Sequence, residues 1–200
     1  MNSLYTSLIE NLKNTTILEY IAVFFGIISP LYSRKENILV YPTGIISVSI
    51  YIYLCFQQGI FAEMGINAFY LIMSFYGWYV WTHPEKGKKE KPISTLSNKE
   101  LIYNVLLTLL FFIILYFILK KVGSTVPVFD SLSTSIFITG MWLMSQKKLE
   151  NWHAWILGNL ISIPLFAYKT LVLTSLYYII ILVIAIFGFI SWKKKFDEQK

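Results

Sequence analysis

The sequence predicts an all-α integral membrane protein, with seven transmembrane helices in a 3+1+3 arrangement of parallel repeats. Three observations predict this class. The chain of 200 residues is 56% hydrophobic and only 14% charged, whereas a soluble domain has about 25% charged residues. Its apolar residues gather in seven segments, each near the roughly 20 residues that a helix needs to cross a bilayer. Two groups of these segments also resemble each other across a central one.

The seven apolar segments are separated by polar connections. In lipid each must be helical, because an unpaired backbone group there costs several kcal/mol. The first segment is the weakest candidate for a membrane span, because Glu19 lies near its start and Pro30 near its end. The fourth segment (FFIILYFIL) is apolar on almost every face. The fifth holds Ser, Thr and Gly, as is typical where helices approach closely. The predicted segments are residues 17–33, 38–57, 61–81, 101–119, 129–146, 152–168 and 171–192.

An internal repeat relates the two halves of the chain. When the sequence is shifted along itself by the number of residues that separates Gly77 from Gly188, Trp81 falls on Trp192 and FYGWYVW falls on IFGFISW. We call this shift the repeat offset. Three crossings reverse the side of the membrane, so a parallel second copy needs one extra crossing, which the fourth segment supplies. Parallel repeats related by an axis along the membrane normal are the architecture of SWEET-type transporters, and we expect a SWEET-like arrangement.

The basic residues predict the orientation. The formal charge is +6, but the lysines lie in short runs between apolar segments, which indicates topology and not nucleic-acid binding. Thirteen Lys and Arg residues lie on one side and four on the other, so the N-terminus is expected outside and the C-terminus in the cytoplasm. The predicted parts are a retained N-terminal polar segment (1–16), a first three-helix repeat (17–82), a cytoplasmic basic loop (83–100), a linker helix (101–122), a second three-helix repeat (129–193) and a cytoplasmic tail (194–200).

Motifs of common enzymes are absent from the sequence. It has no G-x-x-x-x-G-K-[ST] and no H-E-x-x-H, and the single Cys55 builds neither a disulfide nor a cysteine metal site. Glu19, Glu63 and Asp130 all fall near segment ends, whereas ionisable residues deep in a membrane usually mark proton relays. We therefore expect no enzyme, no cofactor and no metal site, and a carrier without an intramembrane proton site.

One short motif begins the sixth segment. Trp152, Trp155 and Asn159 stand at i, i+3 and i+7, so on a helix they share one face over roughly 10 Å. Two indole planes and an amide are suited to hold a flat, polar aromatic molecule. Trp is also enriched at membrane interfaces for reasons unrelated to ligands, so an anchoring or packing role stays open from spacing alone.

This W-x-x-W-x-x-x-N motif resembles the signature of the PnuC-type vitamin transporters, bacterial inner-membrane carriers of nicotinamide riboside. YGWYVW (76–81), the EN before the first Trp (150–151) and FGFISW (187–192) are similar as well. The resemblance covers roughly residues 37–194. It implies that the motif's Trp pair and Asn line the substrate site. It also implies a homotrimer and facilitated diffusion, with phosphorylation by a cytoplasmic vitamin kinase drawing the substrate inward.

The opposite wall of the site and the cargo are less constrained. Asn67, Tyr70 and Trp78 of the third segment are candidates for that wall, and packing explains each equally well. Nicotinamide riboside is a planar cation, which an indole face attracts by about 0.5–2 kcal/mol, and an Asn amide can bond its ribose or carboxamide. Thiamine is also a flat cation, and relatives carry thiamine or riboflavin. A sugar-type carrier and a non-transporting membrane scaffold subunit are the remaining alternatives.

Overall fold

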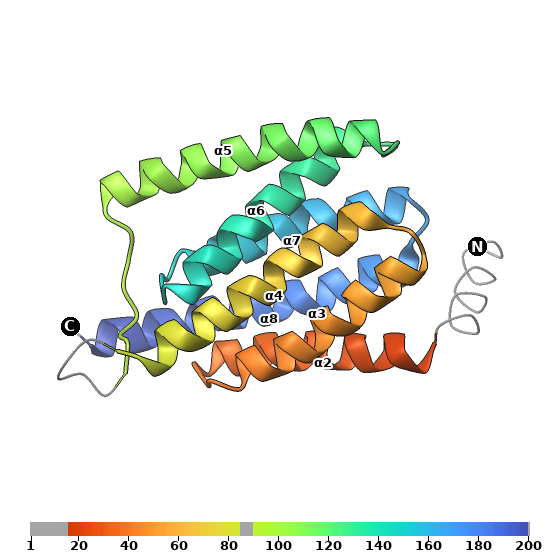
Figure 1. Cartoon of the computed structure of the whole chain (residues 1–200). Coiled ribbons are helices and arrows are strands. Elements are labelled where there is room, and N and C mark those ends of the chain that lie inside the picture. Colours follow the sequence, from red (N-terminus) through yellow and green to blue (C-terminus); the bar gives the residue numbers. More distant parts are fainter. Residues whose placement is uncertain (1–15, 85–89, 200) are drawn as a thin grey trace.

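The computed structural model describes residues 16–84 and 90–199, which form helices and one isolated β-bridge. The predicted segment 1–16 thus lies outside the described residues except for Thr16, as do Lys86, Lys88 and Lys89 of the predicted basic loop. Each predicted apolar segment coincides with a helix, which confirms the all-α class. The described helices are α2 (Ile17–Arg34), α3 (Val40–Gln57), α4 (Phe61–Thr82), α5 (Asn98–Lys121), α6 (Pro127–Ser145), α7 (Asn151–Tyr168) and α8 (Val172–Glu198) (Figure 1).

Local chemistry sets the helix ends that apolarity alone did not predict. Helix α5 begins at Asn98 because the side chains of Ser97 and Glu100 cap its first backbone N–H groups reciprocally. Helix α8 continues past the apolar segment to Glu198. Two i,i+4 ion pairs support this polar extension, Lys193 with Asp197 at 3.6 Å and Lys194 with Glu198 at 3.9 Å.

Four of the described helices are candidate membrane spans by length and composition: α2, α3, α5 and α8. The other three, α4, α6 and α7, are outside this group, and α6 and α7 have polar side chains in their interiors. Many of these face protein and not lipid, such as Ser131, Ser135 and Asn159, which are fully buried. Small and polar side chains at helix contacts are typical of membrane proteins.

The helices form two three-helix units. Helix α3 packs against both α2 and α4 in the first unit (α2–α4), and α7 packs against both α6 and α8 in the second unit (α6–α8). The units meet where α2 contacts α8 and where α4 contacts α6. Helix α5 lies at the periphery and packs mainly against α6 (Figure 1).

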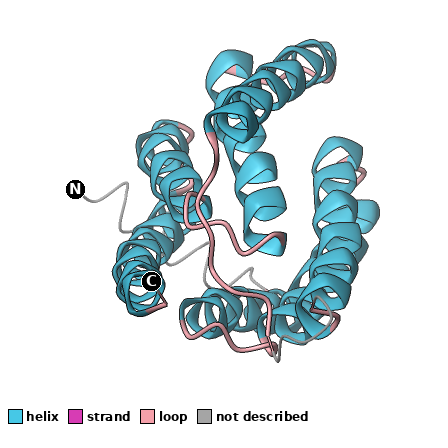
Figure 2. Cartoon of the chain, turned by 90° about the vertical axis from the view of Figure 1, so that its left-hand side faces the viewer, coloured by secondary structure: helices cyan, strands magenta, loops and turns pink. Residues whose placement is uncertain are grey.

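The two ends of the bundle differ. At one end, left in Figure 1, lie the α2–α3 and α6–α7 connections and the last turns of α4 and α8; we call it the closed end. At the other, the open end, lie the α3–α4, α5–α6 and α7–α8 connections. Figure 2 views the molecule from the closed end, with the α4–α5 connection crossing its face.

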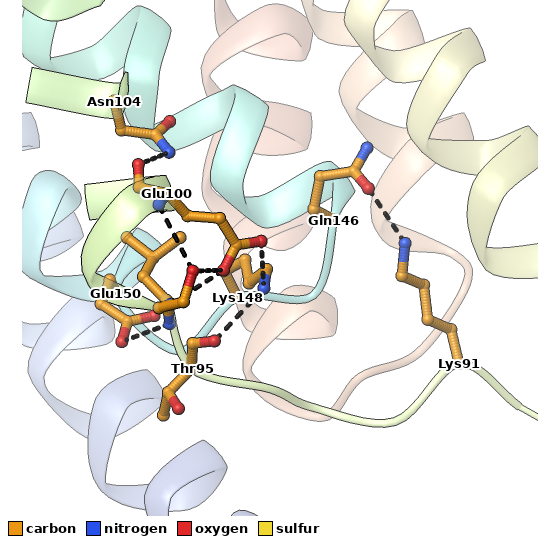
Figure 3. A network of polar contacts seen from close by, with 9 residues as sticks. Lys91, Thr95, Glu100, Asn104, Gln146, Lys148 and Glu150 are labelled. Carbon is orange, nitrogen blue, oxygen red and sulfur yellow. Dashed lines mark hydrogen bonds and ion pairs between the residues drawn. The ribbon is translucent and has the colours of Figure 1, made fainter. Parts of the chain in front are cut away.

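The α4–α5 connection is fastened to the second unit. The N–H of Ser94 donates to Lys147 O at 3.1 Å, and the N–H of Leu149 donates back to Ser94 O at 2.8 Å. Lys148 forms an ion pair with Glu100 at 2.8 Å. Figure 3 shows the Lys148–Glu100 ion pair with the further bonds of Lys91, Thr95, Asn104, Gln146 and Glu150. Helix α5 and its connection are therefore tied to α6 and α7.

Two tryptophans bridge the units at the closed end. Trp81 Nε1 of α4 donates to Met144 O of α6 at 3.3 Å, and Trp192 Nε1 of α8 donates to Ser33 O of α2 at 2.9 Å. The indole rings meet with their centroids 6.1 Å apart, and Ser33 Oγ lies 3.4 Å from Met144 Sδ. These reciprocal contacts fill the closed end.

A buried ion pair lies beside the two tryptophans. Lys147 Nζ is 3.1 Å from Glu36 Oε2, and the side chains are only 3% and 5% exposed. Lys195 contacts the other oxygen of Glu36 at 2.8 Å, and Lys147 lies over the Trp81 ring at 4.6 Å. The charges of the two units thus compensate each other.

Backbone conformations also recur at the repeat offset. Glu36 has φ +52° and Lys147 has φ +53°, and each follows the first helix of its unit. Gly59 has φ +70° and Thr170 has φ +61°, and each follows the second helix. The same turn geometry therefore ends equivalent helices in the two units.

Candidate functional site

A cavity of about 1160 Å³ lies between the two units and is lined by residues of α2, α3, α4, α6, α7 and α8 and by Leu119 of α5. Near the closed end its lining side chains are buried, among them Ser33, Tyr41 and Trp152. Toward the open end its lining residues include the exposed Phe61 and Glu63. The cavity is therefore shut at the closed end and accessible from the other.

Trp152 forms part of the wall nearest the closed end and is only 2% exposed. Its ring lies against Gly188 so closely that a Cβ there would sit 2.4 Å from the ring carbons. The ring also packs edge-on against Trp192, with the centroids 5.5 Å apart and the planes at 86°. Glycine at position 188 is thus what lets the indole lie in this place.

Tyr41 forms the matching part of the first unit. A Cβ at Gly77 would lie 2.5 Å from its ring, and the ring packs edge-on against Trp81 at 5.2 Å and 85°. Tyr41 lines the cavity, yet the sequence analysis did not single it out. A signal was present, because the repeat offset places Tyr41 on Trp152.

An aromatic row forms the side wall of the second unit. Trp155 lines the cavity and packs against Phe137 with the centroids 5.5 Å apart. Phe137 stacks on Tyr178 at 5.9 Å and 8°, and Tyr178 stacks on Phe166 at 5.1 Å. Sequence reasoning missed the three residues beyond Trp155. Nothing distinguishes them in sequence from aromatic residues that face lipid.

Buried polar atoms without partners mark the same cavity. Asn159 is fully buried, and its Nδ2 donates to Trp155 O at 2.6 Å. Its Oδ1, Trp152 Nε1 and the Tyr41 hydroxyl have no hydrogen-bond partner among the described residues. An unsatisfied buried polar atom costs about 1–3 kcal/mol, so a ligand or water that bonds these atoms is favoured.

The predicted opposite wall is present in part. Asn67 and Tyr70 of α4 line the cavity, and Asn67 Nδ2 donates to the backbone oxygen of Glu63 at 2.9 Å. Trp78 does not line it and is 38% exposed on the outer face of α4. The structure thus brings five of the six predicted site residues around one cavity. No cluster of His, Cys, Asp or Glu suited to a metal occurs in residues 16–84 and 90–199.

Comparison with known proteins links this architecture to vitamin transport. A model of the family described as nicotinamide mononucleotide transporter matches residues 16–194. The nicotinamide riboside transporter PnuC of Escherichia coli is 25% identical over 208 residues, covering 91% of this chain and 87% of that protein. The PnuC of Neisseria mucosa is 26% identical over 189 residues, covering 88% and 72%. A crystal structure of the vitamin B3 transporter PnuC is similar in fold, with a TM-score of 0.74, 25% identity and coverage of 98% and 89%.

Proposed function

The chain belongs to the nicotinamide mononucleotide transporter family, and from this premise we propose that it carries a flat, cationic vitamin into the cell, with nicotinamide riboside as the leading substrate. The relatives that are named nicotinamide riboside transporters support this substrate. The single observation that carries the proposal is the placement of Trp152, Trp155 and Asn159 around one cavity between the two units. A scaffold subunit has no need of such a cavity.

Each of these three side chains has a role in the proposal. The indole faces of Trp152 and Trp155 hold the pyridinium ring, since a cation over a Trp face is stabilised by about 0.5–2 kcal/mol. The free Oδ1 of Asn159 accepts a hydrogen bond from a ribose hydroxyl or the carboxamide. Asn67 and Tyr70 face the substrate from α4.

The 3+1+3 arrangement of parallel repeats is also part of the proposal. The repeat offset relates three features of the two units. Each unit has left-handed turn residues at equivalent positions and a glycine against a buried aromatic ring. Each unit also has a Trp that donates a hydrogen bond to the other unit. Helix α5 then serves as the extra crossing. A parallel repeat around an axis along the membrane normal, as in SWEET-type transporters, accounts for all three likenesses.

The family and the apolar helices indicate a multi-pass protein of the bacterial inner membrane. The excess of Lys and Arg on one side supports an N-terminus outside and a C-terminus in the cytoplasm. In this orientation the closed end faces the cytoplasm and the cavity opens outward. A cysteine in place of Glu198, in a Cys55→Ser background, should react with an impermeant reagent only after cells are permeabilised. Labelling of intact cells would reverse the orientation.

Facilitated diffusion, a homotrimer and trapping by a cytoplasmic kinase complete the proposal. Support for diffusion without coupling comes from the site itself, where the buried groups beside the motif are amide, indole and phenol and carry no charge. Proteoliposomes without any ion gradient should equilibrate labelled nicotinamide riboside in both directions. Uptake that needs a proton or sodium gradient contradicts this part.

Binding of a ligand panel tests the substrate. Titration of intrinsic Trp fluorescence with nicotinamide riboside, thiamine, riboflavin and a sugar should give the tightest binding for the first. Trp155→Ala should abolish this binding, whereas Leu160→Ala, an exposed position on the same helix, should not change it. Tighter binding of thiamine would support the proposed site but make thiamine the substrate. Equal affinity in Trp155→Ala would return the motif to a packing role.

A further inference from the structure

The charges around the cavity differ from those of the whole chain. Among the described residues, four charged side chains line it: Glu19, Glu63, Asp130 and Lys169. Three acids and one base give this part of the lining a formal charge of −2. All four belong to the half of the cavity toward the open end, because they lie in the first turns of α2, α4 and α6 and directly after α7.

In the second unit the acid is neutralised. Asp130 of α6 accepts bonds from Lys169 Nζ at 2.6 Å and 2.7 Å, one to each carboxylate oxygen. The two side chains are 14% and 23% exposed, so solvent screens the pair only in part. Asp130 and Lys169 therefore contribute little net field to the cavity.

The first unit has the acid without the base. The repeat offset places Glu19 on Asp130, and both lie in the first turn of their helices. The position equivalent to Lys169 is Gln58, and each of these two residues caps the C-terminus of its helix. Among the described residues Glu19 makes no ion pair. Within residues 16–84 and 90–199 its carboxylate is therefore uncompensated, whereas the second unit has a neutral pair.

Glu63 adds a second uncompensated carboxylate to the first unit. It lies in the first turn of α4, is exposed and forms no ion pair within residues 16–84 and 90–199. Its equivalent in the second unit is the neutral Thr174, which also lines the cavity. Both excess negative charges of the cavity thus come from α2 and α4.

A separate observation supports a ligand in the same cavity. Deeper in it, the fully buried Asn159 has a free Oδ1, and Trp152 has a free Nε1. Low-dielectric walls focus the field of charges at the mouth of a cleft and raise the local concentration of an oppositely charged ligand. We propose that Glu19 and Glu63 select positively charged substrates at the open end, before the aromatic motif binds them. This inference rests on the proposed function.

The proposal separates substrates by charge at constant shape. Nicotinamide riboside carries one positive charge on its ring, and its reduced dihydro form has nearly the same shape and none. At low ionic strength Glu19→Gln with Glu63→Gln should weaken binding of the cation about tenfold and leave the neutral form unchanged. High salt should remove the difference, since the Debye length falls to about 3 Å at 1 M. Gln58→Lys should weaken cation binding in the same direction by pairing with Glu19.

A control variant changes the net charge equally. Asp197→Asn with Glu198→Gln also removes two negative charges, but these exposed residues lie at the closed end. It should bind both forms of the riboside like the wild type. An equal loss of the two forms in the Glu19/Glu63 variant, or the same loss in the control, would overturn the selection by charge.

A measurement without any vitamin keeps this inference distinct from the proposed function. Thr174→Cys in a Cys55→Ser background places the single thiol of the chain in the cavity lining at the open end. The measured quantity is the rate of modification by a cationic methanethiosulfonate divided by the rate for an anionic one. This ratio should be about tenfold higher when Glu19 and Glu63 are present than when both are Gln. An unchanged ratio rejects the inference even if the wild type binds nicotinamide riboside. A changed ratio in a protein that binds no riboside rejects only the substrate.

Discussion

The two three-helix units are alike where they pack and different where they face the cavity. Tyr41 and Trp152 occupy equivalent positions, each against a glycine. Along the same helices, however, Gly44 stands where the second unit has Trp155, and Val48 stands where it has Asn159. Gly44 and Trp155 both line the cavity. The second unit thus supplies the Trp152, Trp155 and Asn159 of the proposed site, whereas the first unit leaves room for the substrate beside them and supplies the proposed charge.

This contrast has a physical explanation. Residues that join the units must satisfy the same geometry twice, which explains why Trp81 recurs as Trp192. A cavity around an asymmetric ligand has no such constraint, because a flat ring and a sugar require different partners on each side. We call the residues that join the units the shared layer and those that face the cavity the divergent layer.

The buried ion pair should be the most sensitive feature, because its two charges occupy equivalent positions in the two units. Glu36→Gln leaves Lys147 buried without its partner, which should cost about 3–5 kcal/mol of stability. Lys147→Met should cost less, since Glu36 keeps Lys195 at 2.8 Å. Thermal unfolding in detergent measures both variants. Equal losses would mean that Lys195 does not compensate Glu36.

The two aromatic–glycine contacts should respond alike. A Cβ at Gly77 would lie 2.5 Å from Tyr41, and one at Gly188 would lie 2.4 Å from Trp152. Gly77→Ala and Gly188→Ala should therefore each destabilise the protein by about 2 kcal/mol through overpacking. Gly65→Ala is the matched control, since nothing lies within 4 Å of its Cβ position. A large loss in only one of the two variants would break the equivalence of the units.

The sequence predicted this shared layer better than the cavity, for a reason that these glycines make clear. Seven apolar segments in lipid must each be helical, so the sequence predicts the helices directly. The match of Gly77 with Gly188 indicates the internal repeat. The pattern of apolar residues does not indicate which face of a helix lines the cavity. The sequence therefore groups Trp78 with Tyr70, although Trp78 lies on the outer face, and it does not distinguish Phe137. Contacts distant in sequence, such as Ser94 with Lys147, leave no local pattern.

In the divergent layer, equivalent positions should respond differently. Asn159→Leu should preserve folding, because Leu suits a membrane helix, and should weaken nicotinamide riboside binding by about 1.5 kcal/mol by leaving a polar substrate group unpaired. Val48→Leu, at the equivalent cavity position of the first unit, should change affinity by less than about threefold. Fluorescence titration measures both variants. Unchanged affinity in Asn159→Leu would remove the amide from the proposed site.

The smallest effect is expected at the turns that follow the second helix of each unit. Gly59 and Thr170 share a left-handed backbone, with φ +70° and +61°, but only glycine adopts it without a steric cost of about 1–2 kcal/mol. Thr170→Gly relieves this cost and gains chain entropy in the unfolded state, which opposes it by roughly 0.5–1 kcal/mol. The net result should be a stabilisation of roughly 0.5 kcal/mol, and Gly59→Thr should destabilise by a similar amount, since the same two terms act with the opposite sign. Thermal unfolding of the two variants measures the changes in stability. Changes of opposite sign would support the same turn geometry at both positions, adopted by two different residues. A destabilised Thr170→Gly variant would instead show that the Thr side chain, whose Oγ1 donates to Lys169 O at 2.6 Å, holds the second turn by itself.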